Sequence, residues 1–283
     1  MKNDDFGDRM KGYENVEARR CLPIGVPILA RIDGKKFSHF TKGLHRPYDE
    51  RLRHLMVDTT RYLMEETGAV GGYTQSDEIT LLFRPDVKED GRYFGGRVQK
   101  MCSIFAGTAT AYFCTRLPEV LPEKVGKMPT FDCRVWTVPD ETEASNVFVW
   151  RQLDATKNAA SMAAMTQYSH NQLLNKSTKE KIDMLKEKGV DFHGYPACWR
   201  RGQFLVRRTF TRAFTSEEIE RLPLKHEARV NPDLLVERGD IVEVDLNMVH
   251  VGNRADVLFR GALPMAANAA TVPYSARMST VGS

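Results

Sequence analysis

The order of strands and helices in the first 140 residues is the feature that most limits how this chain can fold. Short aliphatic or β-branched runs bounded by turn residues predict strands, whereas apolar residues at three- and four-residue spacing predict helices. These patterns alternate as strand, helix, strand, strand, helix, strand. The strands are expected at residues 26–33, 71–75, 79–83 and 129–138, and the helices at 49–67, ended by Gly68, and at 94–116, closed by Pro118.

This order predicts a split βαβ unit, the ferredoxin-like arrangement found in the palm of many polymerases and nucleotide cyclases. The first strand and the central hairpin are neighbours in the antiparallel sheet of such a unit. Asp33, at the end of the first strand, and Asp77, in the turn of the hairpin, are therefore expected to lie side by side. The predicted fold class is α+β, with a βαββαβ polymerase-type palm at 1–140, an added C-terminal helical and β region at 141–261, and a weakly structured tail at 262–283.

The second half of the chain has less regular patterns. Helices are expected at 144–168 and 177–189, and strands at 203–210 and 239–251. A stretch without acidic residues carries five arginines, which suits a phosphate backbone but equally a solvated strand face. These arginines are Arg200, Arg201, Arg207, Arg208 and Arg212.

Composition excludes several classes of protein. The chain has 283 residues, 42% hydrophobic and 28% charged, which is typical of a globular protein, and its net charge of +4 is too small to indicate a nucleic-acid partner by itself. No apolar run approaches the roughly 20 residues of a membrane span, and the polar N-terminus lacks the apolar core of a signal peptide. The five cysteines form no CxxC pair, which argues against a zinc site or a disulfide framework. We therefore expect a cytoplasmic protein without a membrane partner.

Two carboxylates at the ends of neighbouring strands are what a two-metal phosphoryl-transfer site requires. Asp33 and Asp77 are the predicted metal ligands for two Mg²⁺ ions, and Gly34 allows a close backbone approach through which its carbonyl completes the metal shell. Considered separately, Asp33 and Asp77 could each instead be a turn aspartate that binds no metal. Glu78, on the opposite face of a regular strand from Asp77, joins the candidate catalytic residues as an acid that supports the ligands.

The loop after the first acid has the composition of a triphosphate cradle. Lysine ammonium groups and backbone amides in the segment Lys35-Lys36-Phe37-Ser38-His39 can neutralise phosphate charge. The chain contains neither the P-loop motif GxxxxGK[ST] nor the dinucleotide motif GxGxxG, so both of those folds are excluded. Lys100, on the second palm helix, is predicted either to contact phosphate or to lie on a solvated face of the helix.

Several short motifs occur in a fixed order, and together they carry a family resemblance. They are Gly7-Asp8-Arg9-Met10-Lys11 with Tyr13-Glu14, Arg31-Ile32-Asp33-Gly34 with Phe37 and Phe40-Thr41, Arg46-Pro47-Tyr48-Asp49, Gln75-Ser76-Asp77-Glu78, Phe131-Asp132-Cys133-Arg134, and Trp150-Arg151-Gln152 with Asp154. In these motifs the chain resembles the tRNA-His guanylyltransferase family, including its shorter tRNA-His guanylyltransferase-like members. The resemblance extends over roughly residues 6 to 215.

The resemblance implies an activity and its site. Enzymes of this family add nucleotides to the 5′ end of tRNA, opposite in direction to ordinary polymerases. A 5′-monophosphate is first activated by ATP or GTP, the 3′-hydroxyl of an incoming nucleotide then attacks, and a 5′-triphosphate end can skip activation. The family carries two metals at the positions of Asp33, Gly34 and Asp77 and is typically tetrameric. Its pattern, together with the loop above, gives the predicted nucleotide-binding residues Gly34, Lys35, Lys36, Phe37, Ser38, His39, Arg46, Asp49, Ser76 and Lys100.

Two departures from the family pattern concern substrate choice. Eukaryotic members follow Trp-Arg-Gln with a His-Ile-Asn-Asn-Leu-Tyr-Asn-Thr run, of which only Asn158 is kept here, and Ser38 stands where many members have histidine. Strict tRNA-His specificity therefore competes with template-dependent 3′-to-5′ RNA repair using various nucleoside triphosphates. The predicted RNA-binding residues, each of which could instead pair with a surface carboxylate, are Arg134, Arg151, Asn158, Lys176, Arg200 and Arg201.

Two rival classes remain open at this point. A nucleotide cyclase can be built on the same palm, but the Gly-Gly-Asp/Glu-Glu-Phe hairpin of diguanylate cyclases is absent. A non-catalytic RNA-binding palm is disfavoured because both acids are present. The sequence thus predicts a Mg²⁺-dependent nucleotidyltransferase whose C-terminal half helps to hold RNA.

Overall fold

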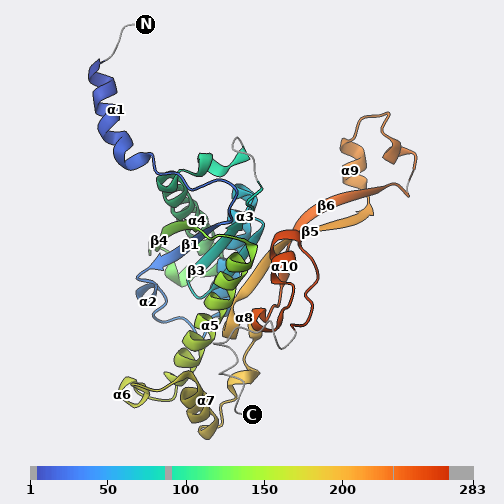
Figure 1. Cartoon of the computed structure of the whole chain (residues 1–283). Helices are drawn as coiled ribbons and strands as arrows, with labels where there is room; N and C mark the ends of the chain where they lie inside the picture. Colours follow the sequence, from blue (N-terminus) through green and yellow to red (C-terminus); the bar gives the residue numbers. More distant parts are fainter. Residues whose placement is uncertain (1–4, 87–90, 232, 268–283) are drawn as a thin grey trace.

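One antiparallel sheet organises the chain, as Figure 1 shows for the computed structural model, which describes residues 5–86, 91–231 and 233–267. Its six strands lie in the order β4-β1-β3-β2-β5-β6. The class is therefore mixed α/β with an antiparallel sheet. The strands are β1 (Ile28–Lys35), β2 (Gly71–Gln75), β3 (Glu78–Phe83), β4 (Thr130–Thr137), β5 (Gln203–Ala213) and β6 (Leu235–Val244).

Helices cover both faces of the sheet. Helices α3 (Glu50–Thr67) and α4 (Val98–Val120) pack on one face, in a core that includes Ile32 of β1. Helices α5 (Glu141–Ala164) and α10 (Arg254–Arg260) pack on the other face, where Leu29 of β1 is buried. The remaining helices are α1 (Asp5–Ala18), α2 (Phe37–Phe40), α6 (His170–Leu173), α7 (Thr178–Glu187), α8 (Ala197–Arg201) and α9 (Ser216–Arg221), with short 3-10 helices at Tyr93–Gly96, Pro122–Lys124, Phe192–Gly194, Glu227–Arg229 and Met248–His250.

The ends of α3 follow directly from the sequence. The Asp49 side chain accepts the backbone N–H of Arg51 and so caps the first turn. Gly68 ends the helix in the left-handed conformation, at φ 71°, which costs glycine little because it has no Cβ. The predicted helix over 49–67 is confirmed.

The ends of α4 differ from the predicted ones. The helix begins at Val98 and not at Phe94, because Phe94 and Gly95 have φ values of 50° and 61°, which an α-helix excludes. It also continues through Pro118 to Val120, and the N–H of Leu121 still donates to the Leu117 carbonyl. A proline in the last turn removes only one hydrogen bond, so the helix need not stop there.

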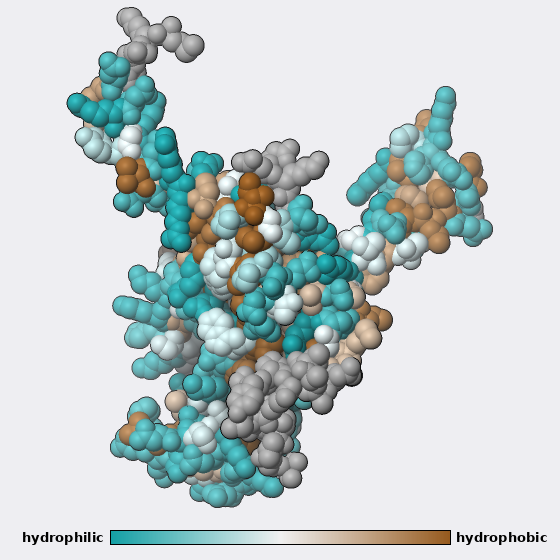
Figure 2. Space-filling view, in the orientation of Figure 1, coloured by the Kyte–Doolittle hydropathy of each residue, from teal (hydrophilic) through white to brown (hydrophobic). Residues whose placement is uncertain are grey.

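The sheet continues beyond the predicted palm. β5 pairs with β2, and β6 pairs with β5 over ten residue pairs. The outer halves of β5 and β6 leave the body of the protein and project as a long arm that carries α9 (Figure 1). Figure 2 shows hydrophobic patches on this arm. β6 ends at Val244, earlier than predicted, because the chain then turns into the 3-10 helix at Met248–His250.

The two ends of the described chain behave differently. Helix α1 projects from the body, and none of its residues is buried (Figure 1). Residues 262–267, the start of the predicted weakly structured tail, are held by a bridge between Val251 and Ala266 and by the Gly252 N–H, which donates to the Met265 carbonyl. The rest of that predicted tail, 268–283, lies outside the described residues. Within the described ranges, none of the helices has both the length and the apolar character that crossing a membrane requires.

Candidate active site

The strand register places four polar side chains in one row across the sheet. Asp132, Asp33, Glu78 and Gln75 are cross-strand partners on β4, β1, β3 and β2. Directly opposed residues point to the same face of a sheet. That face is the one α5 covers, since Leu29, four residues before Asp33 on β1, belongs to the core beneath α5.

The β2–β3 turn brings a second aspartate to the end of β1. Ser76 adopts a positive φ of 51°, which lets the two-residue turn close. The backbone N–H of Gly34 then donates to the carbonyl of Asp77 at 3.1 Å. Asp33 and Asp77 are thus neighbours where the inner strands β1 and β3 meet the β2–β3 turn, which confirms the predicted juxtaposition.

Burial and mutual repulsion make both carboxylates reluctant to ionise. Burial, and then the nearby Asp33 carboxylate, raise the pKa of Asp77 to about 6. Burial, and then the cross-strand neighbour Asp132, raise the pKa of Asp33. A divalent cation between the two oxygen donors would relieve this repulsion, so the donor set fits a hard cation such as Mg²⁺.

The number of protein ligands is small. Across residues 5–86, 91–231 and 233–267, no group of three or more His, Cys, Asp or Glu side chains is placed to hold a metal. Mg²⁺ usually keeps several waters and binds through one or two carboxylates plus substrate phosphates. Two carboxylates and a backbone carbonyl therefore suit a cation that arrives with a triphosphate.

Glu78 is engaged by Arg151 of α5 and not by the site. Arg151 donates from Nε and Nη2 to the two carboxylate oxygens of Glu78, both at 2.7 Å, and from Nη2 to Asp154 at 2.9 Å. The side chain of Arg151 is only 6% exposed. Both side chains still line the second cavity. The ion pair occupies both carboxylate oxygens of Glu78, which fits the supporting role predicted for this acid, while the RNA contact predicted for Arg151 stays a prediction.

Gly34 and Phe37 shape the loop after β1 by packing. A Cβ at Gly34 would lie 2.2 Å from the ring of Phe37, so only glycine fits there. The Phe37 ring contacts Phe40, Phe113 and Phe131 in the core, so this predicted nucleotide-binding residue has its side chain in the core, although the segment borders a cavity. The other predicted loop residues, Lys35, Lys36, Ser38 and His39, are exposed.

Two cavities meet at the acidic turn. The first, of about 610 Å³, extends from the loop after β1 to an aromatic and methionine-rich wall formed with Tyr48 and Trp199, whose rings stack at 5.1 Å. The second, of about 600 Å³, contains Asp33. Both volumes lie in the range of nucleotide-sized ligand sites. Six residues line both cavities: Gln75, Ser76, Asp77, Asn158, Met162 and Met165.

Asp49 lines the first cavity, but its carboxylate is already bonded. It accepts the backbone N–H groups of His45 and Arg51 and the Nε and Nη2 of Arg51, at 2.8 to 3.2 Å. These bonds, led by the Arg51 side chain, lower the pKa of Asp49 to about 2. Asp49 therefore fixes the cavity wall, and its direct contact with a nucleotide stays a prediction. Arg46, exposed on the same wall, remains a candidate for nucleotide contact.

Lys100 lies away from the site and lines neither cavity. It belongs to the first turn of α4 and sits over the ring of Phe94 at 5.9 Å. The part of α4 that reaches the acidic edge is Thr110–Phe113, whose Thr110 hydroxyl accepts the N–H of Phe131. Ten residues of helix separate Lys100 from Thr110, about 15 Å. Lys100 therefore lies apart from the acids, and its phosphate contact stays a prediction.

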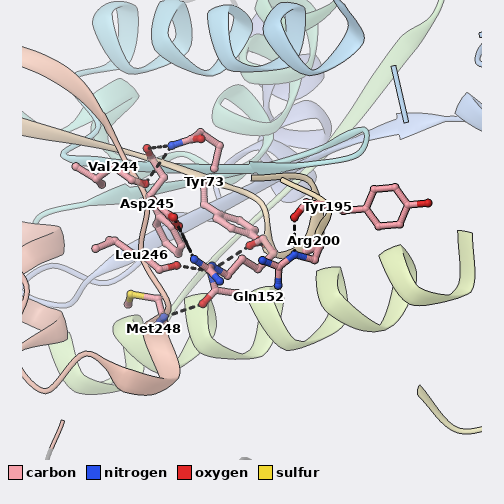
Figure 3. Close-up of polar contacts among 11 residues, drawn as sticks. Tyr73, Gln152, Tyr195, Arg200, Val244, Asp245, Leu246 and Met248 are labelled. Carbon is pink, nitrogen blue, oxygen red and sulfur yellow. Dashed lines mark hydrogen bonds and ion pairs between the residues drawn. The ribbon is translucent and has the colours of Figure 1, made fainter. Parts of the chain in front are cut away.

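Arg200 and Arg201 serve the fold. Figure 3 shows the Arg200 Nε donating to the Tyr195 carbonyl at 2.8 Å. Arg201 Nη2 donates to both carboxylate oxygens of Asp245, at 2.8 and 3.1 Å. The predicted basic stripe is dispersed in the same way further along β5, because Arg207 donates to backbone carbonyls at the end of α3. These contacts explain both arginines within the fold, and the RNA-binding role of Arg200 and Arg201 stays a prediction.

A buried glutamine fixes α5 on the sheet. Gln152 donates to the carbonyls of Arg201 and Leu246 and accepts the N–H of Met248 (Figure 3). The hydroxyl of Tyr73 donates to the same Arg201 carbonyl at 2.9 Å. Because Gln152 follows Arg151 directly, this network also holds Arg151 over Glu78.

The remaining predicted RNA-binding residues lie apart from one another. Asn158 reaches both cavities and donates to Asp154 at 3.4 Å. Arg134 is exposed on β4 and pairs with Asp132 at 3.1 Å. Lys176 pairs with Glu180 at the start of α7, outside both cavities.

Three features were missed by sequence reasoning. The carboxylate of Asp132 beside Asp33 follows from the β1–β4 register, which the alternating strand pattern could have suggested. The Tyr48–Trp199 stack joins segments 150 residues apart, and no local pattern signals it. Met162 lines both cavities, about three turns after the Trp-Arg-Gln motif.

Comparison with known proteins identifies the family. Residues 7–139 match the family model described as tRNA-His guanylyltransferase. The chain is also similar to a bacterial tRNA-His guanylyltransferase-like protein solved in complex with ATP, with 37% identity and a TM-score of 0.67, covering 72% of this chain and 87% of that one. The chain belongs to the tRNA-His guanylyltransferase family.

Two further members show the breadth of this similarity. A bacterial tRNA-His guanylyltransferase-like protein in complex with GTP is 32% identical, with a TM-score of 0.63, over 84% of this chain and 91% of that one. A probable tRNA-His guanylyltransferase of Drosophila melanogaster is 27% identical over 213 residues, 70% of this chain and 72% of the relative. Members of the tRNA-His guanylyltransferase family are nucleotidyltransferases, and this chain is an enzyme of that type.

Proposed function

We propose that this enzyme adds nucleotides to the 5′ end of tRNA in the 3′-to-5′ direction. The observation that carries the proposal is the pair Asp33 and Asp77, two mutually repelling carboxylates at the junction of two cavities of nucleotide size. The order β4-β1-β3-β2 supports a ferredoxin-like, polymerase-type palm at residues 1–140, with residues 141–261 supporting RNA and nucleotide binding. A cytoplasmic location and a tetrameric state stay predictions.

Asp33, Asp77 and the carbonyl of Gly34 would hold the catalytic Mg²⁺ ions, of which the family pattern implies two. Bound there, the cations would neutralise phosphate charge and polarise the attacked phosphoryl group. The raised pKa of Asp77 supports this role, because a cation offsets the cost of keeping both buried carboxylates ionised.

The first cavity suits the nucleotide. The Tyr48 and Trp199 side chains offer an aromatic wall to a purine, while Ser38, Lys36 and Ser76 lie at the end nearest the acids. ATP and GTP bound to the two bacterial relatives support a purine nucleotide here. The second cavity, with Asp33 and Asn158, is then left for the RNA end.

The reaction proceeds by phosphoryl transfer. A 5′-monophosphate attacks the α-phosphate of ATP or GTP and releases pyrophosphate. The 3′-hydroxyl of the incoming nucleotide then attacks the activated 5′ phosphate and releases the nucleoside monophosphate. When the RNA carries a 5′-triphosphate, the same attack releases pyrophosphate and activation is not needed. In both steps the protein positions the reactants and stabilises charge.

Template-dependent repair of various 5′-truncated RNAs is the second candidate function. It is favoured by the stretch of α5 that lines both cavities, where the His-Ile-Asn-Asn-Leu-Tyr-Asn-Thr run of the eukaryotic enzymes is replaced and only Asn158 is kept. A changed lining at the RNA end changes which substrates fit.

The test is nucleotide addition to 5′-labelled RNAs in Mg²⁺ with each nucleoside triphosphate. The panel holds tRNA-His and a 5′-truncated tRNA of another type, each with mono- and triphosphate ends. Asp77→Ala should abolish addition, while the matched control Asp183→Ala, an exposed aspartate on α7, should not. Extension of tRNA-His alone by one G supports the specific guanylyltransferase, templated extension of the truncated tRNA supports repair, and no extension of either RNA refutes the proposal.

A further inference from the structure

An exposed tryptophan stands beside the acidic edge of the sheet. Trp150 of α5 is 52% exposed, although a ring of that size is usually buried. It lines neither of the two cavities. The residue after it, Arg151, is buried, so the two side chains point to different sides of α5.

The guanidinium groups of two arginines lie close to the indole ring. The Arg151 guanidinium carbon lies 4.4 Å from the ring centroid, and that of Arg31 lies 5.6 Å from it. Arg151 is committed to Glu78 and Asp154, whereas Arg31 has a buried Nε with no hydrogen-bond partner among the described residues. Because that Nε is buried, an anion would meet Arg31 through the other guanidinium nitrogens, since the residue lines the second cavity.

This cluster is continuous with the candidate active site. Arg31 lines the second cavity together with Asp33 and lies two residues before it on β1, about 7 Å along the strand. Its cross-strand partner on β4 is Arg134, which is exposed. Arg31, which lies close to the indole ring, is therefore about two base steps from Asp33.

We infer that Trp150 and Arg31 form the platform for the RNA end, with the indole stacking on a base near the 5′ terminus and Arg31 contacting a phosphate of the same strand. The inference rests on the proposed function and adds the residues that position the RNA. Aromatic rings combined with cations that follow the backbone are the usual means of holding single-stranded nucleic acid without reading its sequence. RNA explains this cluster better than a protein partner does, because Arg31 lies without a hydrogen-bonded acceptor from the described part of the chain, beside a site for phosphoryl transfer.

Equilibrium binding separates RNA from nucleotide recognition. The fluorescence anisotropy of a labelled 5′-monophosphate hairpin RNA would be measured with wild type, Trp150→Ala, Trp150→Phe and Arg31→Gln, and ATP binding would be measured on the same proteins. Phe210→Ala, which removes an exposed aromatic ring from the outer half of β5, is the matched control. Trp150→Ala should raise the Kd for RNA about 5- to 150-fold, the range of one base–aromatic stack, with the Kd for ATP unchanged.

The conservative and charge variants give independent readouts. Trp150→Phe should restore part of the RNA affinity. Arg31→Gln should reduce the slope of log K against log salt by about 0.7, the value for one phosphate contact on a single strand, whereas Trp150→Ala should leave the slope unchanged. A merely structural role would lower RNA and ATP affinity together and would not change the slope.

The outcomes also separate this inference from the proposed function. Unchanged RNA affinity in Trp150→Ala, or an equal loss of RNA and ATP binding, overturns the inference while nucleotide addition by the wild type stands. Tryptophan-dependent RNA binding by a protein that adds no nucleotide would support the inference and overturn the proposed function. A wild type that binds no RNA overturns both.

Discussion

The buried ion pair between Glu78 and Arg151 offers a direct test of how the acidic residues divide their roles. The three changes are Glu78→Met, Arg151→Met and the two together. Each single change leaves one charge buried without its partner, since the two side chains are 9% and 6% exposed. The double change replaces both charges by apolar groups of similar length.

The expected free energies follow from that burial. Removing one partner of a buried pair costs about 3–5 kcal/mol, whereas replacing the whole pair by apolar residues is often close to neutral. Arg151 keeps a contact with the half-buried Asp154, which reduces the loss in Glu78→Met by up to about 1 kcal/mol. The double variant should therefore be about 3 kcal/mol or more stable than the sum of the single effects implies.

Urea unfolding at pH 7.5 would measure the free energies, and nucleotide addition would measure activity. If Glu78 only positions the sheet and α5, the double variant regains both stability and most of the activity. If Glu78 takes part in chemistry, the double variant folds but stays inactive. Additive losses of stability in the two single variants would refute the reasoning, because they would mean that the two side chains do not depend on each other.

Three further outcomes are expected. The pKa of Asp77 is raised from 3.8 to about 6. Without divalent ions, the free energy of unfolding should therefore fall by about 3 kcal/mol as pH rises from below 4 to above 6. Urea titrations across this pH range would measure the fall, and Asp77→Asn should remove it. Asp49→Ala should lower the free energy of unfolding by about 1–2 kcal/mol at pH 7. Because the pKa of Asp49 is about 2, the stabilisation by its carboxylate should be lost from the wild type, and not from the variant, as pH falls from about 4 to 2. Gly34→Ala should push the Phe37 ring aside and cost about 1–3 kcal/mol, measured as a lower Tm, while an unchanged Tm would show that the ring moves freely.

The features that the sequence predicted well are those with local causes. The strand before Asp33, the helix capped by Asp49 and Gly68, and the two-residue turn at Asp77 each depend on residues within a few positions of one another. The juxtaposition of Asp33 and Asp77 followed from the order of elements, because an antiparallel sheet brings the end of the first strand to the hairpin turn.

The position of Lys100 relative to the acids was predictable from the same topology. Strand β3 runs away from the turn that holds Asp77, so the helix after it begins at the far end of the sheet. A basic residue in the first turn of α4 cannot reach the acids. Chain direction, and not residue type, decides this case.

The roles of the arginines could not be read from the sequence, because their partners come from distant segments. Arg151 meets Glu78 across 73 residues, and Arg201 meets Asp245 across 44. Charge type predicts that an arginine will find an anion, but only packing decides whether that anion is a carboxylate of the chain or a phosphate of a ligand.

That choice also decides which carboxylates in this row of the sheet are neutralised by an arginine of α5. Glu78 and Asp33 are cross-strand partners in the same row, so either could have received the guanidinium of α5. The hydrogen bonds of Gln152 fix the position of α5 along the sheet, and in that position Arg151 forms its ion pair with Glu78. Asp33 and Asp77 are left facing each other with raised pKa values.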